Sequence, residues 1–227
     1  MMMQDREKIV LEMLKKIPKQ SVVLIGGYAV NAYVPPRFSI DCDLVVLDNL
    51  AEVEAELKNN GFVKTESGDT LYGNYVRYLR EKEKVSFDLL VNSVLDRRTG
   101  LVFEKMLFEE YSKNRVMVGR ATPARIEMKI ADPELLFAMK FVSGRKQDIR
   151  DLFMLAGEDL EWSLVASLVS KKCKGDLVEK RIALIKQSIE SESYRDSLHG
   201  PYGRIPDERF ERCRKHLLEL LEKLTQS

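Results

Sequence analysis

Hydrophobic side chains recur along the chain with two different periods, and the change of period falls near residue 131. Before it, helical spacing alternates with the continuous or alternating apolar runs that are typical of strands. After it, every apolar stretch has helical spacing. The pattern predicts strands over 21–25, 40–47, 62–66, 73–80, 84–91, 114–118 and 125–130, and helices over 5–17, 27–34, 50–60, 133–143, 146–157, 160–172, 176–191 and 207–224.

Turn-forming residues set the limits of these elements. Pro35 and Pro36 end the helix over 27–34, and Asp132 before Pro133 is the capping signal that opens the helical half. We expect loops over 96–100 and 191–206. The fold class predicted is α/β (α+β), with a β-helix-β start suited to parallel pairing and a later antiparallel meander. We place a mixed-sheet α/β domain at residues 1–131 and a helical domain at residues 132–227.

Two carboxylates open the strand over 40–47. Asp41 and Asp43 are spaced i, i+2, so their side chains point to the same side of the sheet, while Cys42 points to the other. Like charges at one strand end repel each other. The pair therefore suggests a divalent cation between them.

A third carboxylate, Asp88, lies inside the apolar strand over 84–91. An aspartate there is costly to bury unless it is paired, hydrogen-bonded or a ligand. A solvent-facing Asp88 at a strand end is the equally weighted alternative. Together with Asp41 and Asp43 it gives three carboxylates on neighbouring strands, a donor set that suits Mg²⁺ or Mn²⁺ completed by substrate phosphates.

Gly26 and Gly27 form the turn between the strand over 21–25 and the helix that follows. Backbone amides without side chains at a helix N-terminus bind anions such as the phosphates of a nucleotide. A Gly-Gly pair alone is more often a tight corner. The Asp-x-Asp pair that follows shortly after favours a phosphate-binding turn beside a metal site.

Composition narrows the class of protein. The 227 residues include 44% hydrophobic residues, enough for a proper core, and the net charge of +1 gives no global field toward nucleic acid or membrane. Three separated cysteines show no metal spacing, which indicates free thiols in a reducing compartment. We find no signal peptide and no membrane span, so we expect a cytoplasmic protein.

The motifs resemble a known family. Gly26-Gly27, Asp41-x-Asp43 and the later Asp88 are similar to the pattern of the polymerase-β-like nucleotidyltransferase superfamily. More narrowly, G-G-x-A with R-F-S-x-D-x-D resembles the AbiEii-like nucleotidyltransferases, the enzymes of type IV toxin–antitoxin systems. The helical half adds a match to that family's K-x(4)-R-x-x-D-x-x-D element. The residues of this wider match, which covers roughly residues 21–157, are Arg37, Ser39, Lys140, Arg145, Asp148 and Asp151.

The resemblance implies transfer of a nucleoside monophosphate from an NTP to an acceptor hydroxyl, with release of pyrophosphate. Asp41, Asp43 and Asp88 would be catalytic and would hold Mg²⁺ or Mn²⁺. The triphosphate would contact Gly26, Gly27, Arg37, Ser39, Lys140 and Arg145, supported by Asp148 and Asp151.

The implied acceptor is tRNA, a protein or a small molecule, and an antitoxin or regulator is an implied partner. The near-neutral charge slightly disfavours a tightly held nucleic acid. The alternative is a non-catalytic nucleotide-binding or partner-binding protein on the same fold. For Lys140, Asp148 and Asp151 alone, a solvated face of ion pairs is the alternative to a functional cluster.

Overall fold

The computed structural model describes residues 2–70 and 73–226, and the chain divides into two compact units. Residues up to Leu95 together with Val102–Asp132 form an α/β unit, and Asp96–Leu101 together with the chain from Pro133 onward form a helical unit. The α/β unit contains a mixed sheet, and the helical unit follows it in the sequence. The predicted fold class is confirmed.

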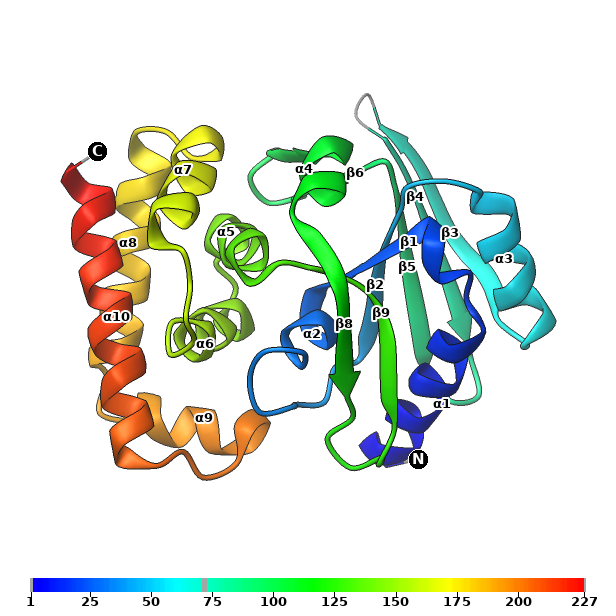
Figure 1. Cartoon of the computed structure of the whole chain (residues 1–227), viewed down its shortest axis with the longest axis horizontal. Coiled ribbons are helices and arrows are strands. Elements are labelled where there is room, and N and C mark those ends of the chain that lie inside the picture. Colours follow the sequence, from blue (N-terminus) through cyan, green and yellow to red (C-terminus); the bar gives the residue numbers. More distant parts are fainter. Residues whose placement is uncertain (1, 71–72, 227) are drawn as a thin grey trace. The chain divides into compact units, whose positions relative to one another are not determined.

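Among the described residues, strands of the α/β unit form a seven-stranded sheet in the order β3-β4-β5-β2-β1-β9-β8 (Figure 1). Its strands β3, β4 and β5 are the predicted antiparallel meander, and β2 and β5 pair in parallel. The strand bounds are β1 Val22–Ile25, β2 Asp41–Val46, β3 Val63–Thr70, β4 Gly73–Arg80, β5 Val85–Val91, β8 Ser112–Val118 and β9 Arg125–Ala131.

The start of the chain differs from the expected parallel arrangement, because β1 and β2 pair antiparallel. A parallel crossover needs a connection long enough to return along the whole sheet. The helix between the strands, α2 Gly26–Val30, has only five residues. It is followed by a loop through Pro35 and Pro36, so the chain reverses at the end of β1 and places Ile25 opposite Asp43.

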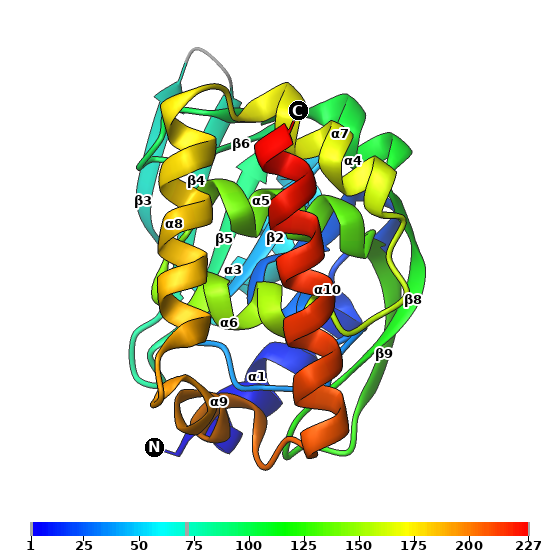
Figure 2. The ribbon, with the colours of Figure 1, turned by 90° about the vertical axis from the view of Figure 1, so that its left-hand side faces the viewer.

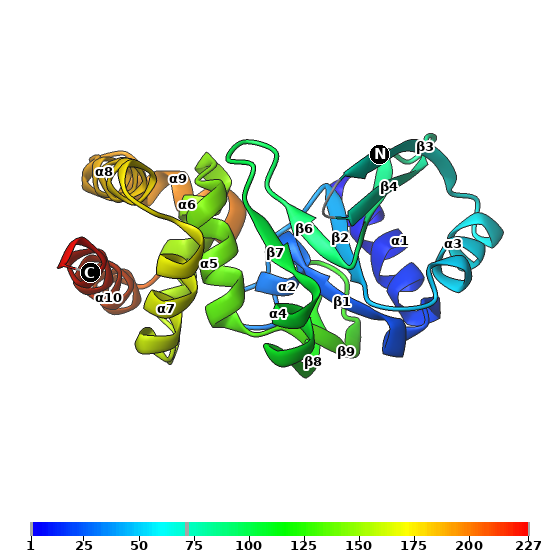
Figure 3. The same ribbon diagram turned by 90° about the horizontal axis from the view of Figure 1, so that it is seen from above.

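Helices cover both faces of the sheet. The views in Figures 1 and 3 place α1 Met3–Lys16 and α3 Leu50–Asn59 along one face and α2 on the opposite face. Cys42, Phe87 and Tyr78 are register partners on β2, β5 and β4, and all three are fully buried. Tyr78 donates a hydrogen bond of 2.9 Å to Glu54 of α3, so these side chains face α3.

The hydrophobic pattern did not predict β6 Ser93–Leu95, β7 Val102–Glu104, α4 Lys105–Glu110 or the 3₁₀ turn Lys19–Ser21. The first two pair with each other outside the main sheet. Each has six residues or fewer, which is too short to show a hydrophobic period.

The helical unit has two long helices, α8 and α10, which lie side by side in Figure 2. The segment 191–206 was wrongly predicted as a loop, because it contains α9. Tyr194, Leu198 and Tyr202 of α9 are spaced i, i+4 and i+8, and all three are buried. The bounds are α5 Pro133–Ser143, α6 Lys146–Leu155, α7 Trp162–Lys172, α8 Asp176–Glu190, α9 Tyr194–Tyr202 and α10 Asp207–Gln226.

No helix in the described ranges combines the length and the apolar character that a membrane crossing demands.

A buried carboxylate ties α1 to the loop between β8 and β9. Glu7 is fully buried, and its two oxygens accept hydrogen bonds of 2.6, 2.9 and 2.9 Å from the backbone N–H groups of residues 120, 121 and 122. Charge-assisted bonds to backbone donors are among the stronger ones, and a buried donor left without a partner is costly.

We therefore expect Glu7→Ala to lower the free energy of unfolding by about 3 kcal/mol, because three backbone donors lose their acceptor. Urea denaturation followed by circular dichroism measures this. The matched control is Glu12→Ala on the same helix, whose carboxylate is 57% exposed and 4.0 Å from Lys8. The control should change stability by less than about 0.5 kcal/mol. Equal effects of the two substitutions would contradict a structural role for Glu7.

Candidate active site

Strand register places charged residues side by side on one face of the sheet. Asp43 on β2 is the register partner of Asp88 on β5, and Asp88 is the register partner of Arg77 on β4. Asp41 lies two residues before Asp43 and therefore on the same face. Cys42 is fully buried on the other face, as the alternation predicts.

Arg77 lies between two of the carboxylates. Its Nη2 is 2.7 Å from Asp41 Oδ1, and its Nε is 3.4 Å from Asp88 Oδ1. Asp41 also accepts a short hydrogen bond from the hydroxyl of Ser86. The side chains of Asp41 and Asp88 are 40% and 15% exposed, so the pair is open to solvent on the Asp41 side. The guanidinium thus balances two carboxylates that repel each other.

The environment of Asp88 favours its protonated form more than is usual for an aspartate. Burial raises the pKa of Asp88, the charge of Asp41 raises it further, and Arg77 opposes the change. Tyr75, on the same face of β4, donates a 3.2 Å hydrogen bond to Asp88 Oδ1. Burial and the nearby Asp88 raise the pKa of Tyr75 to about 12, so this hydroxyl stays a donor at neutral pH.

Gly26 is required by its close approach to Asp43. Its φ of +68° is a left-handed conformation that side chains rarely adopt, and a Cβ on Gly26 would overlap the Asp43 carboxylate. The second glycine is equally confined. A Cβ on Gly27 would lie 2.5 Å from Ser39 Oγ and 2.8 Å from Arg37 Nη2. The glycine pair therefore lets these three polar side chains pack directly on the backbone of the turn.

Asn31 holds the backbone of the loop that carries Arg37 and Ser39. Asn31 is buried, donates a 2.9 Å hydrogen bond to the Arg37 carbonyl and accepts a 3.0 Å bond from the Arg37 N–H. Arg37 is only 5% exposed, and its Nη1 donates to the carbonyl of Phe38. The Arg37 side chain is thereby held over Gly27.

The thiol on the opposite face of β2 plays no part in this constellation. Burial, followed by neighbouring carboxylates of which Asp43 is the first, raises the pKa of Cys42 well above its ordinary value. A thiol in such surroundings stays protonated and unreactive. All three cysteines are free, as the sequence predicts, and all three are buried.

The carboxylate oxygens of this face are suited to a divalent cation, but their present positions do not form a metal site. Among the described residues, no three carboxylate, thiol or imidazole groups converge as a ready-made metal site. The donors are nevertheless of the hard oxygen type that Mg²⁺ and Mn²⁺ prefer. Arg77 already supplies positive charge between Asp41 and Asp88. A bound cation would take over that charge, which requires the guanidinium to move.

The charged residues of the helical unit form a separate buried cluster. Gly144, with φ of +58°, ends α5, and α6 begins one residue after Arg145, yet the charges still gather. Lys140 Nζ is 2.7 Å from Asp148 and 2.9 Å from Asp151. This cluster of Lys140, Asp148 and Asp151 is not a solvated face, because their exposed fractions are 9%, 6% and 0%.

Further hydrogen bonds complete this cluster. Tyr202 of α9 and Gln147 donate to Asp151 Oδ1 at 2.5 and 3.1 Å, and the Arg145 N–H donates to Asp148 at 3.3 Å. The Arg145 side chain itself is exposed. The ammonium of Lys140 thus has two carboxylate partners within its own unit. Its predicted contact with a triphosphate stays a prediction.

The predicted site residues therefore fall into two clusters, one in each unit. The α/β unit brings together Gly26, Gly27, Arg37, Ser39, Asp41, Asp43 and Asp88, and the helical unit brings together Lys140, Asp148 and Asp151. Sequence reasoning missed Arg77, Tyr75 and Asn31. Arg77 and Tyr75 lie two residues apart on a predicted strand and therefore on one face, so antiparallel pairing of the predicted strands over 73–80 and 84–91 would have placed both near Asp88.

Comparison with known proteins found a solved structure with a similar fold. No protein-family model matches the sequence, and no curated protein matches it significantly. A Helicobacter pylori protein provisionally assigned as a nucleotidyltransferase has a similar solved structure, with a TM-score of 0.51 and 19% identity over 98% of this chain and 96% of that one. The chain therefore shares the fold of that structure.

Two other solved structures are less similar. JHP933, also from Helicobacter pylori, aligns with 99% of this chain and 94% of its own at a TM-score of 0.49 and 18% identity. A STING-associated c-di-GMP synthase from Capnocytophaga granulosa aligns with 98% of this chain and 79% of its own at a TM-score of 0.24 and 12% identity.

The buried lysine gives a direct test of the helical cluster. We expect Lys140→Met to lower the free energy of unfolding by about 3–5 kcal/mol, because two buried carboxylates lose their cation. Urea denaturation measures this, with Lys171→Met on the exposed end of α7 as the control. A Lys140→Met protein as stable as the control would contradict a structural role and would favour a lysine reserved for a ligand.

Proposed function

We propose that this protein is a metal-dependent nucleotidyltransferase that moves a nucleoside monophosphate from an NTP to an acceptor hydroxyl and releases pyrophosphate. One observation carries the proposal. The glycine turn lies directly against Asp43, and Asp43 lies beside Asp88 in register, so the backbone of the turn adjoins a row of carboxylates. The nucleotidyltransferase-like fold supports the same activity.

The turn is suited to the phosphates of the nucleotide. Gly26 and Gly27 carry no side chain of their own, and Arg37 and Ser39 bring a guanidinium and a hydroxyl to Gly27. Charge-assisted hydrogen bonds from such groups neutralise a triphosphate and orient it. Because Asn31 fixes the backbone of Arg37, this geometry needs little reorganisation on binding.

The carboxylates are suited to holding Mg²⁺ or Mn²⁺. Asp41, Asp43 and Asp88 would be its ligands, and the metal would offset charge on the triphosphate and on the leaving pyrophosphate. In the proposed reaction Asp88 receives the proton of the acceptor hydroxyl, directly or through water.

The narrower assignment rests on motifs. G-G-x-A, R-F-S-x-D-x-D and the Lys140 to Asp151 element support an AbiEii-like, toxin-type enzyme that an antitoxin or regulator controls. The buried Lys140 cluster would then position α6, whose Arg145 is exposed and available to a nucleotide or acceptor. The acceptor would be tRNA, a protein or a small molecule.

A non-catalytic nucleotide-binding protein is the second candidate. The observation that favours it is Arg77, which occupies the space between Asp41 and Asp88 with a permanent positive charge. In such a protein the guanidinium would replace the metal for good. The two candidates differ in whether a cation displaces Arg77 and in whether label moves from the NTP to an acceptor.

The first experiment measures transfer. We expect the wild-type protein with Mg²⁺ to move α-labelled NMP from one of the four NTPs to total tRNA or to a component of a cell lysate. The double substitution Asp41→Asn, Asp43→Asn should lower transfer at least about 100-fold, because two of the metal carboxylates lose their charge. Asp48→Asn, an exposed aspartate just beyond the far end of β2, is the matched control and should keep full activity.

Undiminished transfer by the double variant would contradict the metal assignment. Absence of transfer to every acceptor, together with NTP binding that does not depend on Mg²⁺, would favour the non-catalytic candidate.

The second experiment measures the metal. We expect Arg77→Gln to bind Mn²⁺ about threefold to tenfold more tightly than the wild type, because the guanidinium no longer competes for two carboxylates. Electron paramagnetic resonance of free Mn²⁺ gives the affinity. The control is Arg80→Gln on the same strand, where the arginine pairs with Glu83 instead. Weaker Mn²⁺ binding by Arg77→Gln than by this control would argue that Arg77 is not a competitor of the cation.

A further inference from the structure

A second basic constellation lies in the helical unit, away from the Lys140 cluster. A cavity of about 190 Å³ is bordered by α6, the end of α8 and the start of α9. It is smaller than the roughly 300–1,000 Å³ of pockets for drug-sized molecules, so it suits one small group. The polar residues among its lining are Lys146, Arg150, Ser188, Ser191, Ser193 and Ser197.

No ion pair within the described residues neutralises the two cations of this cavity. Lys146 and Arg150 are spaced i, i+4 on α6 and therefore share one face of that helix. Arg150 donates to neutral oxygens of Ser197 and Gln147, at 3.4 and 3.3 Å. Within residues 2–70 and 73–226, neither cation has an ion-pair partner, in contrast to Lys140 with its two. The cavity therefore carries uncompensated positive charge.

The serine hydroxyls leave at least one donor for a ligand. Ser188 and Ser197 already donate to backbone carbonyls of their own helices, at 2.8 and 2.7 Å. Ser191 and Ser193 are hydrogen-bonded to each other at 3.1 Å, and for neither does the described part of the chain offer a second side-chain partner. Because one bond uses one hydroxyl proton, the other proton of this pair remains available.

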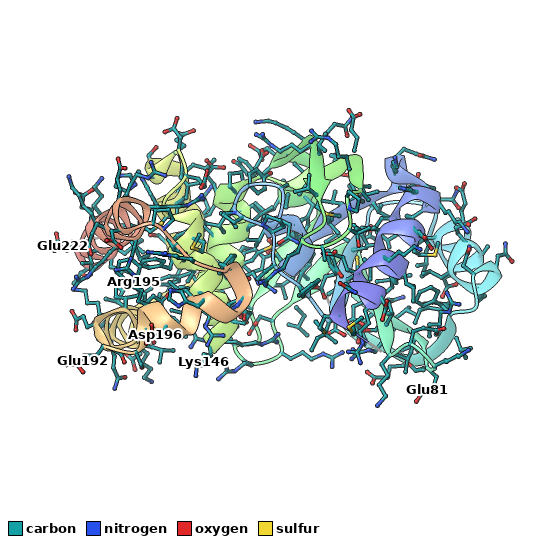
Figure 4. All side chains as sticks on the ribbon, turned by 90° about the horizontal axis from the view of Figure 1, so that it is seen from below. Glu81, Lys146, Glu192, Arg195, Asp196 and Glu222 are labelled. Carbon is teal, nitrogen blue, oxygen red and sulfur yellow. The ribbon has the colours of Figure 1, made fainter. Side chains whose placement is uncertain are left out.

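Acidic residues near the cavity do not line it. Glu192 lies between Ser191 and Ser193 in the sequence, and Asp196 lies on α9, but both are exposed and neither borders the cavity. Figure 4 shows Lys146, Glu192 and Asp196 at the outer surface where α8 and α9 meet. Their negative charge lowers affinity for an anion at low salt without occupying the place where the anion would bind.

We propose that this cavity binds a phosphate group, held by the charges of Lys146 and Arg150 and by the hydroxyls of Ser191 and Ser193. A pair of cations with hydroxyl donors matches the charge and the several acceptor oxygens of a phosphate. The phosphate is either inorganic or the 5′-phosphate of a nucleotide, since both present the same oxygens. The proposal is independent of the proposed function, because none of these residues belongs to the candidate active site.

The test uses the whole chain labelled with ¹⁵N. Inorganic phosphate is titrated at constant ionic strength against chloride, and AMP is titrated against adenosine. We expect saturable shifts of the amide resonances of residues 188–197 with phosphate or AMP and none with chloride or adenosine. Saturation by inorganic phosphate alone assigns the free ion, and tighter saturation by AMP assigns the nucleotide. Shifts that are equal for phosphate and chloride would overturn the proposal.

Two charge-reversal variants distinguish a specific binding site from a general effect of positive charge. Lys146→Glu should weaken phosphate binding at least about tenfold, because one of two charge-assisted contacts becomes repulsive. Lys146 is exposed in the first turn of α6, where an acidic residue is well tolerated, and thermal denaturation checks that the fold is kept. Lys180→Glu, an exposed lysine of α8 that does not border the cavity, makes the same charge change and should bind as the wild type. Equal loss in both variants would overturn the proposal.

Discussion

The close approach of the Asp43 carboxylate to the backbone of Gly26 is the contact on which the candidate site depends. It exists because β1 and β2 pair antiparallel, with Ile25 opposite Asp43, so that the end of one strand and the start of the other coincide. A side chain at position 26 would occupy the volume of that carboxylate. The glycine turn and the row of carboxylates therefore depend on the same strand pairing, and any change of register between these strands would separate them.

Charge is distributed differently in the two units. In the α/β unit, Asp41 and Asp88 share one guanidinium and remain partly exposed, so their charge is available to a ligand. In the helical unit, Lys140 is buried with two carboxylates, and Tyr202 completes the network. Buried networks of that kind hold elements in a fixed geometry rather than release them to a ligand. The Lys146 and Arg150 pair is the opposite case, with cations and no carboxylate partner in the described residues.

Much of the architecture followed from periodicity. Seven strands of the main sheet and the long helices were predicted because their hydrophobic repeats are several turns or several alternations long. The failures were α9, hidden by Gly200 and Pro201 near its end, and the short elements β6, β7 and α4. The parallel pairing expected for β1 and β2 was wrong because alternation along a strand carries no information about the direction of its neighbour.

The sequence by itself determined that Asp41 and Asp43 share a face, that Cys42 lies on the other, and that two glycines precede them, since these follow from spacing along the chain. Only the tertiary structure decided that Asp88 lies beside Asp43, that Arg77 stands between Asp41 and Asp88, and that Lys140 is buried. Those contacts join residues far apart in the sequence. They are set by strand order, register and helix packing, which local patterns of hydrophobicity do not encode.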